Sequence, residues 1–577
     1  MHLSTLAALS LSPLFGSVLA AAQEPLRSRQ DDTGSPPIEA KWPHQTFKSR
    51  PDLQPPVLDI AKHGPVAEGY LFFTVAGDAA HNYSTFIMTD EGELVWQSPL
   101  AIHTNAHVQT LVDTNATTTT TTTNPNAGDA GAGRGQQVLS FFNGITYSEP
   151  WGLGYGLVQI LDSAYASVKN VTVESGIEVL HFQETDDTWL SFLDMHESRI
   201  TKAGTSMLVT AYNVTPADLS PVNGPADGWI ADSVFYEKDV ATGEVLFEWS
   251  ALAHLEEVPF EGAIDYYPLE DLGLNGSYPW GPFHINSVDE FPDNDGGYLV
   301  SSRFYCSLFR IARDGSVVWR LDGQKGHDFS LLNDLQFAYQ HDAVIRSTRP
   351  SAADATKNVY TISIFDNAWS STSSPANGRT NTRGLVFEVD EGAMTASLLQ
   401  AFEDPEDPMK SVSQGNLQFT EGKGAISGRA GRAGSGEQHA LLGYGSVPKI
   451  KEFDHSGKLV MTVQFGDLGN VQSYRAYKMP WVGKPTARPD AVALREGPEG
   501  VVKVYVSWNG ATEVDGWQVF ASALEDGTGM VKVAEAAKTG FETAIEIKGC
   551  GEDVKYVRVQ AVGDGLEGDE SKVVKII

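Results

Sequence analysis

One hairpin pattern recurs along most of this chain and constrains its fold more than any other feature. An apolar run ends at an aspartate, a short polar turn follows, and a second apolar run leads away. The clearest copy spans residues 86–96, where Asp90 and Gly92 separate the two runs. Aspartate and glycine favour tight turns between strands. The pattern therefore predicts antiparallel strand pairs and a mainly β fold.

Six copies of this hairpin occur, and their aspartates recur roughly every 65 to 77 residues. The aspartates are Asp90, Asp162, Asp239, Asp314, Asp390 and Asp454. A repeat of this length suits radial four-stranded sheets with long loops, so we expect a six-bladed β-propeller over residues 56–485. A pair of β-sandwiches is the alternative arrangement of such short strands.

The pattern changes after Trp481, where three prolines mark a linker. Short alternating strands around a central tryptophan, Trp508 or Trp517, then fill residues 486–577. We expect this part to form a small immunoglobulin- or fibronectin-like β-sandwich. Both parts of the chain are thus predicted to be all-β.

The first 22 residues are apolar and end in small residues, which is typical of a secretory signal peptide. A membrane anchor is the alternative, but the apolar stretch is short for a span. Residues 23–55 are expected to form an N-terminal arm, and the mature protein to be extracellular, with no membrane association after signal removal. Five Asn-x-Ser/Thr sites fit secretion: Asn82, Asn115, Asn170, Asn213 and Asn275. Two cysteines, Cys306 and Cys550, are too few for a disulfide framework, although they could pair with each other.

The formal net charge of −33 argues against nucleic acid or anionic lipid as a partner, because both require a basic surface. The same charge repels small anions at long range. An anionic substrate therefore needs a local cluster of arginine, lysine or histidine.

A polar motif follows each hairpin before the next one begins. The motifs lie at residues 103–107, 194–199, 283–287, 340–342, 414–418 and 473–476. In a propeller they would fall on the innermost strands, so several histidines and arginines would meet in one channel. Neutral imidazole serves as a nucleophile or base, and guanidinium neutralises the oxygens of a transferring phosphoryl or sulfuryl group. Hydrogen bonding between blades is the alternative role, and a metal site at His103, His196, His284 and His341 lacks the usual ligand motifs.

Eight stretches carry a family resemblance that covers most of residues 50–485. They read RPDLQPP (50–56), WGPFHINSVD (280–289), YLVSSR (298–303), WRL (319–321), FAYQHDA (337–343), FDN (365–367), GNLQ (415–418) and SYRA (473–476). In them the chain resembles the arylsulfotransferase family, in its secreted fungal-type branch. The resemblance implies a six-bladed propeller that transfers a sulfuryl group between phenols through a sulfated histidine, without a nucleotide sulfate donor.

Carried over by position, the resemblance implies catalytic roles for His284, His341 and Arg383, the last as a sulfate-binding residue. Substrate binding is predicted for His196, Arg303, Arg475, Asn286 and Asn416. Bacterial members carry a further histidine, the nucleophile, in the next blade, whereas residues 411–416 contain none here. Either His341 or His284 is then the nucleophile, or this branch no longer transfers sulfate.

The sequence thus predicts an aryl sulfate sulfotransferase with an aryl sulfate and a phenol as its small-molecule partners and with no metal or other cofactor. The competing hypothesis is a non-catalytic secreted propeller that binds a small ligand or a cell-wall component. A quinone-dependent dehydrogenase propeller is a third possibility, but the tryptophan-docking repeats expected of that class are not evident.

Overall fold

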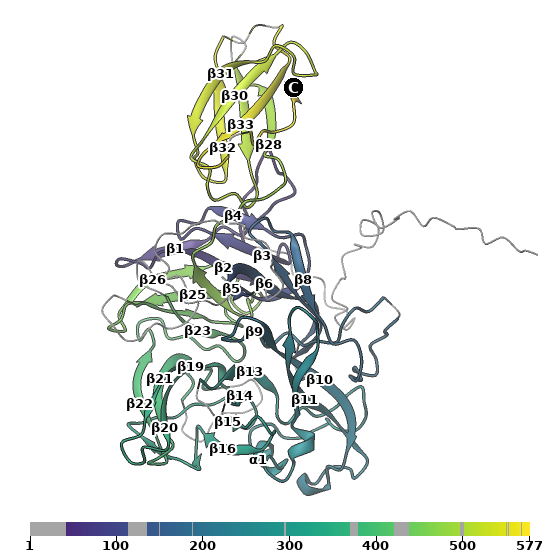
Figure 1. Cartoon of the computed structure of the whole chain (residues 1–577), viewed down its shortest axis with the longest axis vertical. Coiled ribbons are helices and arrows are strands. Elements are labelled where there is room, and N and C mark those ends of the chain that lie inside the picture. Colours follow the sequence, from purple (N-terminus) through teal and green to yellow (C-terminus); the bar gives the residue numbers. More distant parts are fainter. Residues whose placement is uncertain are drawn as a thin grey trace, which may run out of the picture. The chain divides into compact units, whose positions relative to one another are not determined.

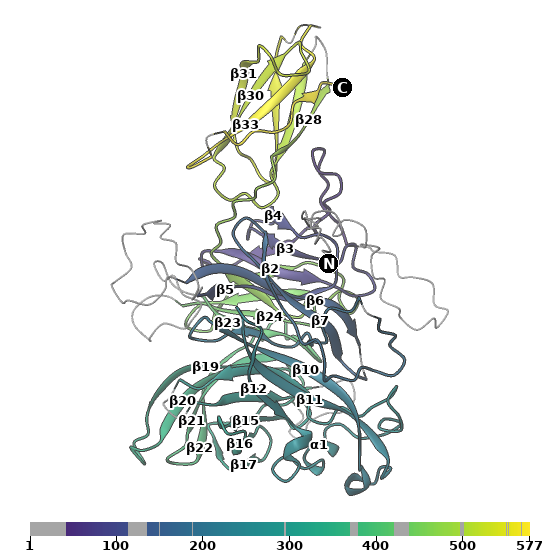
Figure 2. The ribbon, with the colours of Figure 1, turned by 45° about the vertical axis from the view of Figure 1, so that its right-hand side comes forward.

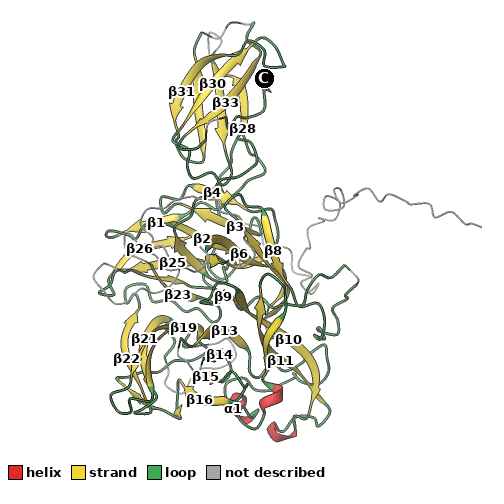
Figure 3. Ribbon diagram, viewed as in Figure 1, coloured by secondary structure: helices red, strands yellow, loops and turns green. Residues whose placement is uncertain are grey.

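The computed structural model describes residues 42–112, 135–148, 150–186, 188–292, 296–369, 379–420, 438–496, 501–549, 551, 553–566 and 568–577. Regular structure in these residues is almost entirely β-strand (Figure 3). The helical elements are single short turns: η1 (Ser220–Val222), η2 (Leu252–His254) and α1 (Glu261–Ile264). The predicted all-β class is therefore confirmed. Among the described residues, no helix is long and apolar enough to cross a membrane.

The described strands between residues 59 and 479 form six sheets of four or five strands, paired antiparallel except where β18 joins β22 (Figures 1 and 2). Three sheets, in strand order, are β27 (Ala476–Met479), β2 (Tyr70–Val75), β3 (Ser84–Met88), β4 (Leu94–Gln97); β5 (His103–Leu111), β6 (Gln136–Tyr147), β7 (Leu153–Leu161), β8 (Ser167–Val171); and β12 (Val245–Ser250), β11 (Gly228–Asp239), β10 (Ser206–Ala217), β9 (Ser198–Ile200). The other three are β13 (Ile285–Glu290), β14 (Tyr298–Ser302), β15 (Ser307–Ile311), β16 (Val317–Asp322), β17 (Gly326–His327); β18 (Ser330–Leu332), β22 (Thr395–Phe402), β21 (Arg383–Asp390), β20 (Asn358–Asp366), β19 (His341–Pro350); and β1 (Asp59–Lys62), β26 (Leu459–Gln464), β25 (Lys449–Phe453), β24 (Ala440–Gly443), β23 (Asn416–Phe419).

All six predicted hairpins are present as paired strands. They are β3–β4, β7–β8, β11–β12, β15–β16, β21–β22 and β25–β26. The aspartates stabilise the turns directly, since Asp314 Oδ1 accepts the backbone N–H of Ser316 at 3.0 Å and Asp454 Oδ1 accepts that of Ser456 at 2.9 Å. The repeated local signal in the sequence thus corresponds to the same hairpin in each sheet.

The six polar motifs lie at or just before six strands, β5, β9, β13, β19, β23 and β27, one in each sheet. Contacts link neighbouring sheets in a cycle, through β5 with β9, β10 with β13, β13 with β19, β19 with β23, β24 with β27, and β27 with β5. Strands from distant parts of the sequence therefore meet where the polar residues are concentrated. The arrangement of the sheets as propeller blades stays a prediction.

The two ends of this region are joined by strand pairing. The late strand β27 pairs antiparallel with β2, and the early strand β1 pairs with β26. The first and the last parts of the six-sheet region thus complete each other's sheets.

Residues 490–575 contribute two further sheets. The first consists of β28 (Asp490–Arg495), β29 (Val502–Ser507) and β32 (Glu542–Ile547). The second consists of β31 (Val531–Ala537), β30 (Gly516–Ser522), β33 (Tyr556–Val562) and β34 (Val574–Lys575). Their inner faces share one hydrophobic core around the buried Trp517. Direct bonds join this part to the rest, because Asn509 Oδ1 accepts the backbone N–H of Gln97 at 3.0 Å and Glu542 Oε1 accepts the hydroxyl of Ser49 at 2.5 Å. All described residues belong to one compact unit, Pro36–Ile577.

Several predictions fall outside the described residues: the signal peptide (1–22), the first part of the N-terminal arm (23–41), Asn115 and Cys550. Cys306 is described, and it is a buried free thiol. Burial raises the pKa of this thiol far above its ordinary value, so it stays protonated at neutral pH.

Candidate functional site

A pocket of about 600 Å³ is lined by residues in or just before β5, β9, β13, β19, β23 and β27. Its polar lining includes His196, His284, Arg303, His341, Gln414 and Tyr474. Four of the residues predicted from the sequence therefore lie around one cavity: the three histidines and Arg303. The pocket volume falls within the range usual for small-molecule sites.

Irregular backbone directs the histidine motifs into this pocket. The pairing of β13 with β14 shifts between Ile285 and Ser287, and that of β19 with β20 shifts between His341 and Val344. His284 adopts φ 54° and Gln414 φ 64°, in the left-handed region that non-glycine residues rarely occupy. Bulges and strained residues of this kind redirect side chains and concentrate at functional sites.

His196 is held by a buried carboxylate. Oδ2 of Asp194 lies 2.5 Å from Nδ1 of His196. The carboxylate accepts the hydrogen of Nδ1, so Nε2 is the ring nitrogen left to exchange a proton with a bound ligand. Within the described residues no hydrogen bond engages Nε2, and the ring lies 4.9 Å from that of His284, at 83°. Asp194 thus fixes both the orientation and the tautomer of this pocket histidine.

His341 is hydrogen-bonded at both ring nitrogens. Nδ1 donates to Oδ1 of Asn367 at 2.7 Å, and Nε2 accepts the backbone N–H of Gln414 at 3.1 Å. Burial and the nearby charge of Arg303 hold the pKa of His341 well below its ordinary value. The ring is therefore neutral, and its Nε2 lone pair is engaged in the hydrogen bond from Gln414.

His284 is the least hydrogen-bonded of the three histidines. Within the described residues its ring makes ring contacts, such as 5.0 Å to Phe304, but no hydrogen bond. Burial, then the neighbouring His196 and Arg303, hold its pKa well below the ordinary value, so the imidazole is neutral. Gly152 makes room for the ring, because a Cβ there would lie 3.2 Å from Cε1 of His284.

Two cationic residues line the same pocket. The Cζ atom of Arg303 lies 4.7 Å from the ring centroid of Phe304, and its Nη2 donates to the carbonyl of Val412 at 3.1 Å. Lys410 is exposed and lines the pocket as well. Together they supply the local positive charge that an anionic substrate needs in a chain of net charge −33.

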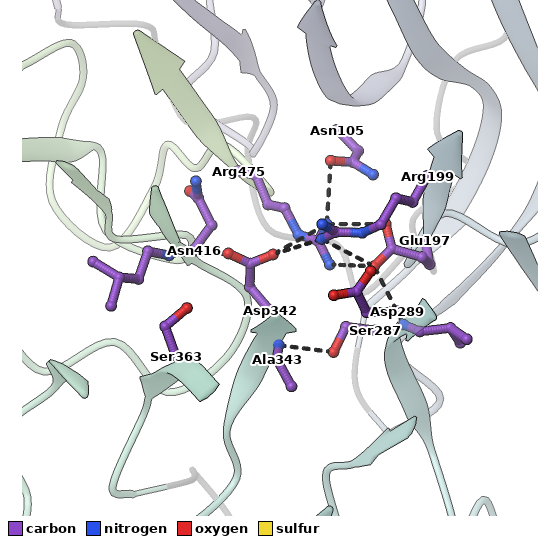
Figure 4. A network of polar contacts seen from close by, with 12 residues as sticks. Asn105, Glu197, Arg199, Ser287, Asp289, Asp342, Ala343, Ser363, Asn416 and Arg475 are labelled. Atoms are coloured by element: carbon purple, nitrogen blue, oxygen red, sulfur yellow. Dashed lines mark hydrogen bonds and ion pairs between the residues drawn. The ribbon is translucent and has the colours of Figure 1, made fainter. Parts of the chain in front are cut away.

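Arg475, predicted to bind substrate, lies in a buried ionic network (Figure 4). It is not among the residues that line the pocket. Its Nη1 lies 3.2 Å from Oε1 of Glu197 and 3.6 Å from Oδ1 of Asp342. Burial opposes ionisation of Glu197, but Arg475 and Arg199 outweigh it and hold the pKa of this carboxyl below its ordinary value. Arg475 thus balances buried carboxylates.

Three further predicted residues also bond to the protein and do not line the pocket. Nε of Arg383 lies 3.1 Å from Oδ2 of Asp366. Asn286 donates to the carbonyl of Gln340 at 2.6 Å. Asn416 bonds both backbone groups of Ala476, donating at 2.8 Å and accepting at 2.9 Å, so it joins β23 to β27. The contacts of Asn286 and Asn416 match the alternative role of hydrogen bonding between sheets, whereas the Arg383–Asp366 pair joins neighbouring strands of one sheet.

Four pocket or supporting residues were not assigned from the sequence: Asp194, Lys410, Gln414 and Tyr474. Tyr474 and Arg475 stand directly before β27. If the alternation of an extended strand continued to these two residues, their side chains would point to opposite sides. That alternation could have indicated that only one of the two faces the pocket. Asp194 stands two residues before His196, a spacing that allows its carboxylate to reach the ring. Within the described residues, no group of three or more histidine, cysteine, aspartate or glutamate side chains could hold a metal ion.

Comparison with known proteins gives one family match. The model of a family described as arylsulfotransferase (ASST) matches residues 132–466, more than half of the chain. No curated protein matches. Among solved structures, the chain is similar to a Bacteroides caccae protein of unknown function (11% identity, 71% of this chain and 98% of that one, TM-score 0.31). It is also similar to dihydro-heme d1 dehydrogenase NirN (11% identity, 88% and 82%, TM-score 0.26) and to Morganella morganii TcdA4 (8% identity, 76% and 21%, TM-score 0.19).

Proposed function

The chain belongs to the arylsulfotransferase family, and we propose that it transfers a sulfuryl group from an aryl sulfate to a phenol through a pocket histidine. One observation carries the proposal. Three buried imidazoles line a single pocket together with Arg303 and Lys410. Neutral imidazole can accept a sulfuryl group, and the two cations can neutralise its oxygens.

His284 is the proposed nucleophile. The sequence left His341 and His284 as candidates, but Nε2 of His341 accepts the backbone N–H of Gln414. A lone pair engaged in that bond is a poor nucleophile, whereas no described residue hydrogen-bonds the ring of His284. His341 then has a positioning role, because it connects Asn367 to the backbone of Gln414.

His196 is the proposed proton carrier. The proposed cycle starts with His196 as the imidazolium, hydrogen-bonded to Asp194 through Nδ1 and carrying a second proton on Nε2. In the first half-reaction a nitrogen of His284 attacks sulfur, the bond from sulfur to the aryl oxygen breaks, and the leaving phenolate takes the proton from Nε2, which leaves His196 neutral. In the second half-reaction the acceptor phenol gives its proton to the same nitrogen as its oxygen attacks sulfur and the N–S bond breaks. Both histidines return to their starting states, and no further reactant is consumed.

The test is to incubate the purified protein with 4-nitrophenyl sulfate, with and without an acceptor phenol. We expect 4-nitrophenol release that depends on the acceptor, and its loss in His284→Ala with the fold retained by circular dichroism. The His341→Ala variant should keep measurable transfer. Absence of transfer in folded wild-type protein would favour the non-catalytic ligand-binding propeller.

We also infer that the six sheets are the blades of a propeller, closed where β27 pairs with β2. The cycle of contacts between neighbouring sheets and the six equivalent hairpins support this arrangement. Secretion after removal of residues 1–22, with glycans on some of the five Asn-x-Ser/Thr sites, remains part of the proposal. Sequencing the N-terminus of the exported protein, and its mass before and after deglycosylation, test these two points.

A further inference from the structure

We propose that an aromatic rim beside the pocket, made of Tyr147, Trp151, Phe182 and Tyr278, binds a second aromatic ring of the substrate. The preferred substrates are then phenols or aryl sulfates with two or more rings. This inference rests on the proposed function, since it specifies the substrate class of the same site.

The four rings form one connected group from separate parts of the chain. Trp151, in the β6–β7 connection, lies 5.4 Å from Phe182 and 5.7 Å from Tyr278, measured between ring centroids. Tyr147, the last residue of β6, lies 5.7 Å from Phe182 and 6.4 Å from Trp151. These separations are those of tilted and edge-to-face aromatic pairs, so the rim presents ring surfaces in several orientations.

The outer rings of the rim remain open to solvent. Phe182 and Tyr278 are each 46% exposed. Large apolar side chains exposed together mark binding sites more often than isolated ones do. None of the four rim residues carries a charge, which suits a neutral ring.

The rim is continuous with the pocket. Tyr147, Ser148 and Gly152 line the pocket, and Trp151 adjoins Gly152 in the chain. Gly152 also lies against His284, the proposed nucleophile. A substrate whose reacting oxygen is near His284 can therefore extend along the same segment towards Trp151.

The size of the pocket supports a substrate larger than one ring. About 600 Å³ is a volume usual for ligands of several rings, and a single phenyl sulfate would leave most of it empty. The buried histidines and Arg303 line the pocket, and the exposed rings of Phe182 and Tyr278 belong to the rim beside it. A multi-ring phenol has the same division between one reactive hydroxyl and an apolar remainder.

The test compares biphenyl-4-ol with phenol as acceptors, with 4-nitrophenyl sulfate as the donor. Wild-type protein should prefer biphenyl-4-ol in kcat/KM. The double variant Phe182→Ala/Tyr278→Ala should lower the ratio of the two kcat/KM values about tenfold, because two aromatic contacts are removed. Leu399→Ala, at a 54% exposed position in β22, is the matched control and should keep the wild-type ratio. An unchanged ratio in the double variant overturns the inference.

A binding measurement separates this inference from the proposed function. Calorimetric titration of wild-type protein with biphenyl-4-ol should give tighter binding than with phenol, and the double variant should lose that difference. Trp151→Phe should remove a fluorescence change that biphenyl-4-ol causes in the wild type. Tighter binding of biphenyl-4-ol without sulfuryl transfer would support the role of the rim and contradict the proposed function. Sulfuryl transfer with equal binding of biphenyl-4-ol and phenol would support the proposed function and contradict the role of the rim.

Discussion

Oδ2 of Asp194 lies 2.5 Å from Nδ1 of His196, and the same carboxylate accepts backbone N–H groups from His196 and Gly154 at 2.9 and 2.8 Å. The backbone bonds hold the carboxylate in place, and the carboxylate in turn holds the ring. A donor–acceptor arrangement of this kind selects one tautomer of a catalytic histidine.

Asp194→Asn should therefore reduce sulfuryl transfer about 100-fold or more, because the proton carrier loses its fixed tautomer. The loss of activity should be larger for donors whose phenolate is a poor leaving group than for 4-nitrophenyl sulfate, because 4-nitrophenolate leaves with little protonation. Rates across a series of substituted aryl sulfates measure this. An equal loss for all donors would indicate that His196 does not carry the proton.

Gly152→Ala should lower activity by displacing His284. Gly152 has φ 58°, and a Cβ there would lie 3.2 Å from Cε1 of His284. Gly176→Ala is a matched control, since Gly176 also has positive φ (84°) but a Cβ there meets nothing within 4 Å. Both variants should lose roughly 1 kcal/mol of unfolding free energy from backbone strain. Only Gly152→Ala should lose transfer, as measured by kcat with 4-nitrophenyl sulfate.

Arg475→Met should cost about 3–5 kcal/mol of unfolding free energy, because it removes one of the two guanidiniums that balance the buried Glu197 and Asp342 and leaves only Arg199 beside them. Arg349→Met is the comparison, since Arg349 is 54% exposed and pairs with Glu388 at the surface. Its loss should stay below about 1 kcal/mol. Denaturant unfolding of both variants gives the two values, and similar losses would contradict the structural role of Arg475.

Acid should destabilise the fold through buried neutral histidines. Burial lowers the pKa of His103 from 6.5 to about 3. The folded pKa lies below the unfolded one, so this contribution is complete above pH 6.5 and falls as the pH drops from 6.5 towards 3. Between pH 7 and pH 5, His103 alone should account for about 2 kcal/mol of lost stability.

His103→Gln should remove that part of the loss, and unfolding curves at the two pH values measure it. The exposed His455, in the turn between β25 and β26, provides the control variant His455→Gln. If the wild type and His103→Gln lost equal stability between pH 7 and pH 5, the buried neutral state of His103 would be refuted.

The sequence predicts those parts of the fold that depend on local chemistry. The hairpin at Asp314 is predictable because the turn aspartate bonds to Ser316, only two residues away. The gathering of His196, His284 and His341 is predictable because each stands at the same place in a repeated unit. Because the unit repeats, a motif recognised in one sheet predicts where the equivalent residues lie in the next sheet.

The roles of the arginines are not predictable in this way, because their partners are remote in sequence. Arg475 bonds to Glu197, which is 278 residues away, and Arg383 bonds to Asp366 across neighbouring strands. An isolated sequence motif does not distinguish a guanidinium that faces a pocket from one that balances a buried carboxylate. Asp194 was not assigned for a different reason: its partner His196 is only two residues away, but the sequence does not show that the backbone between them turns the carboxylate towards the ring.

The pairing of Ala476–Met479 with Tyr70–Val75 determines the order in which the protein can be completed during synthesis. The sheet whose strands are translated first cannot be finished until the ribosome has passed Ala476. A premature stop codon or a protease cut before that point leaves the edge of Tyr70–Val75 without its partner strand. Truncated chains are therefore expected to aggregate through this early segment, however intact their remaining residues are.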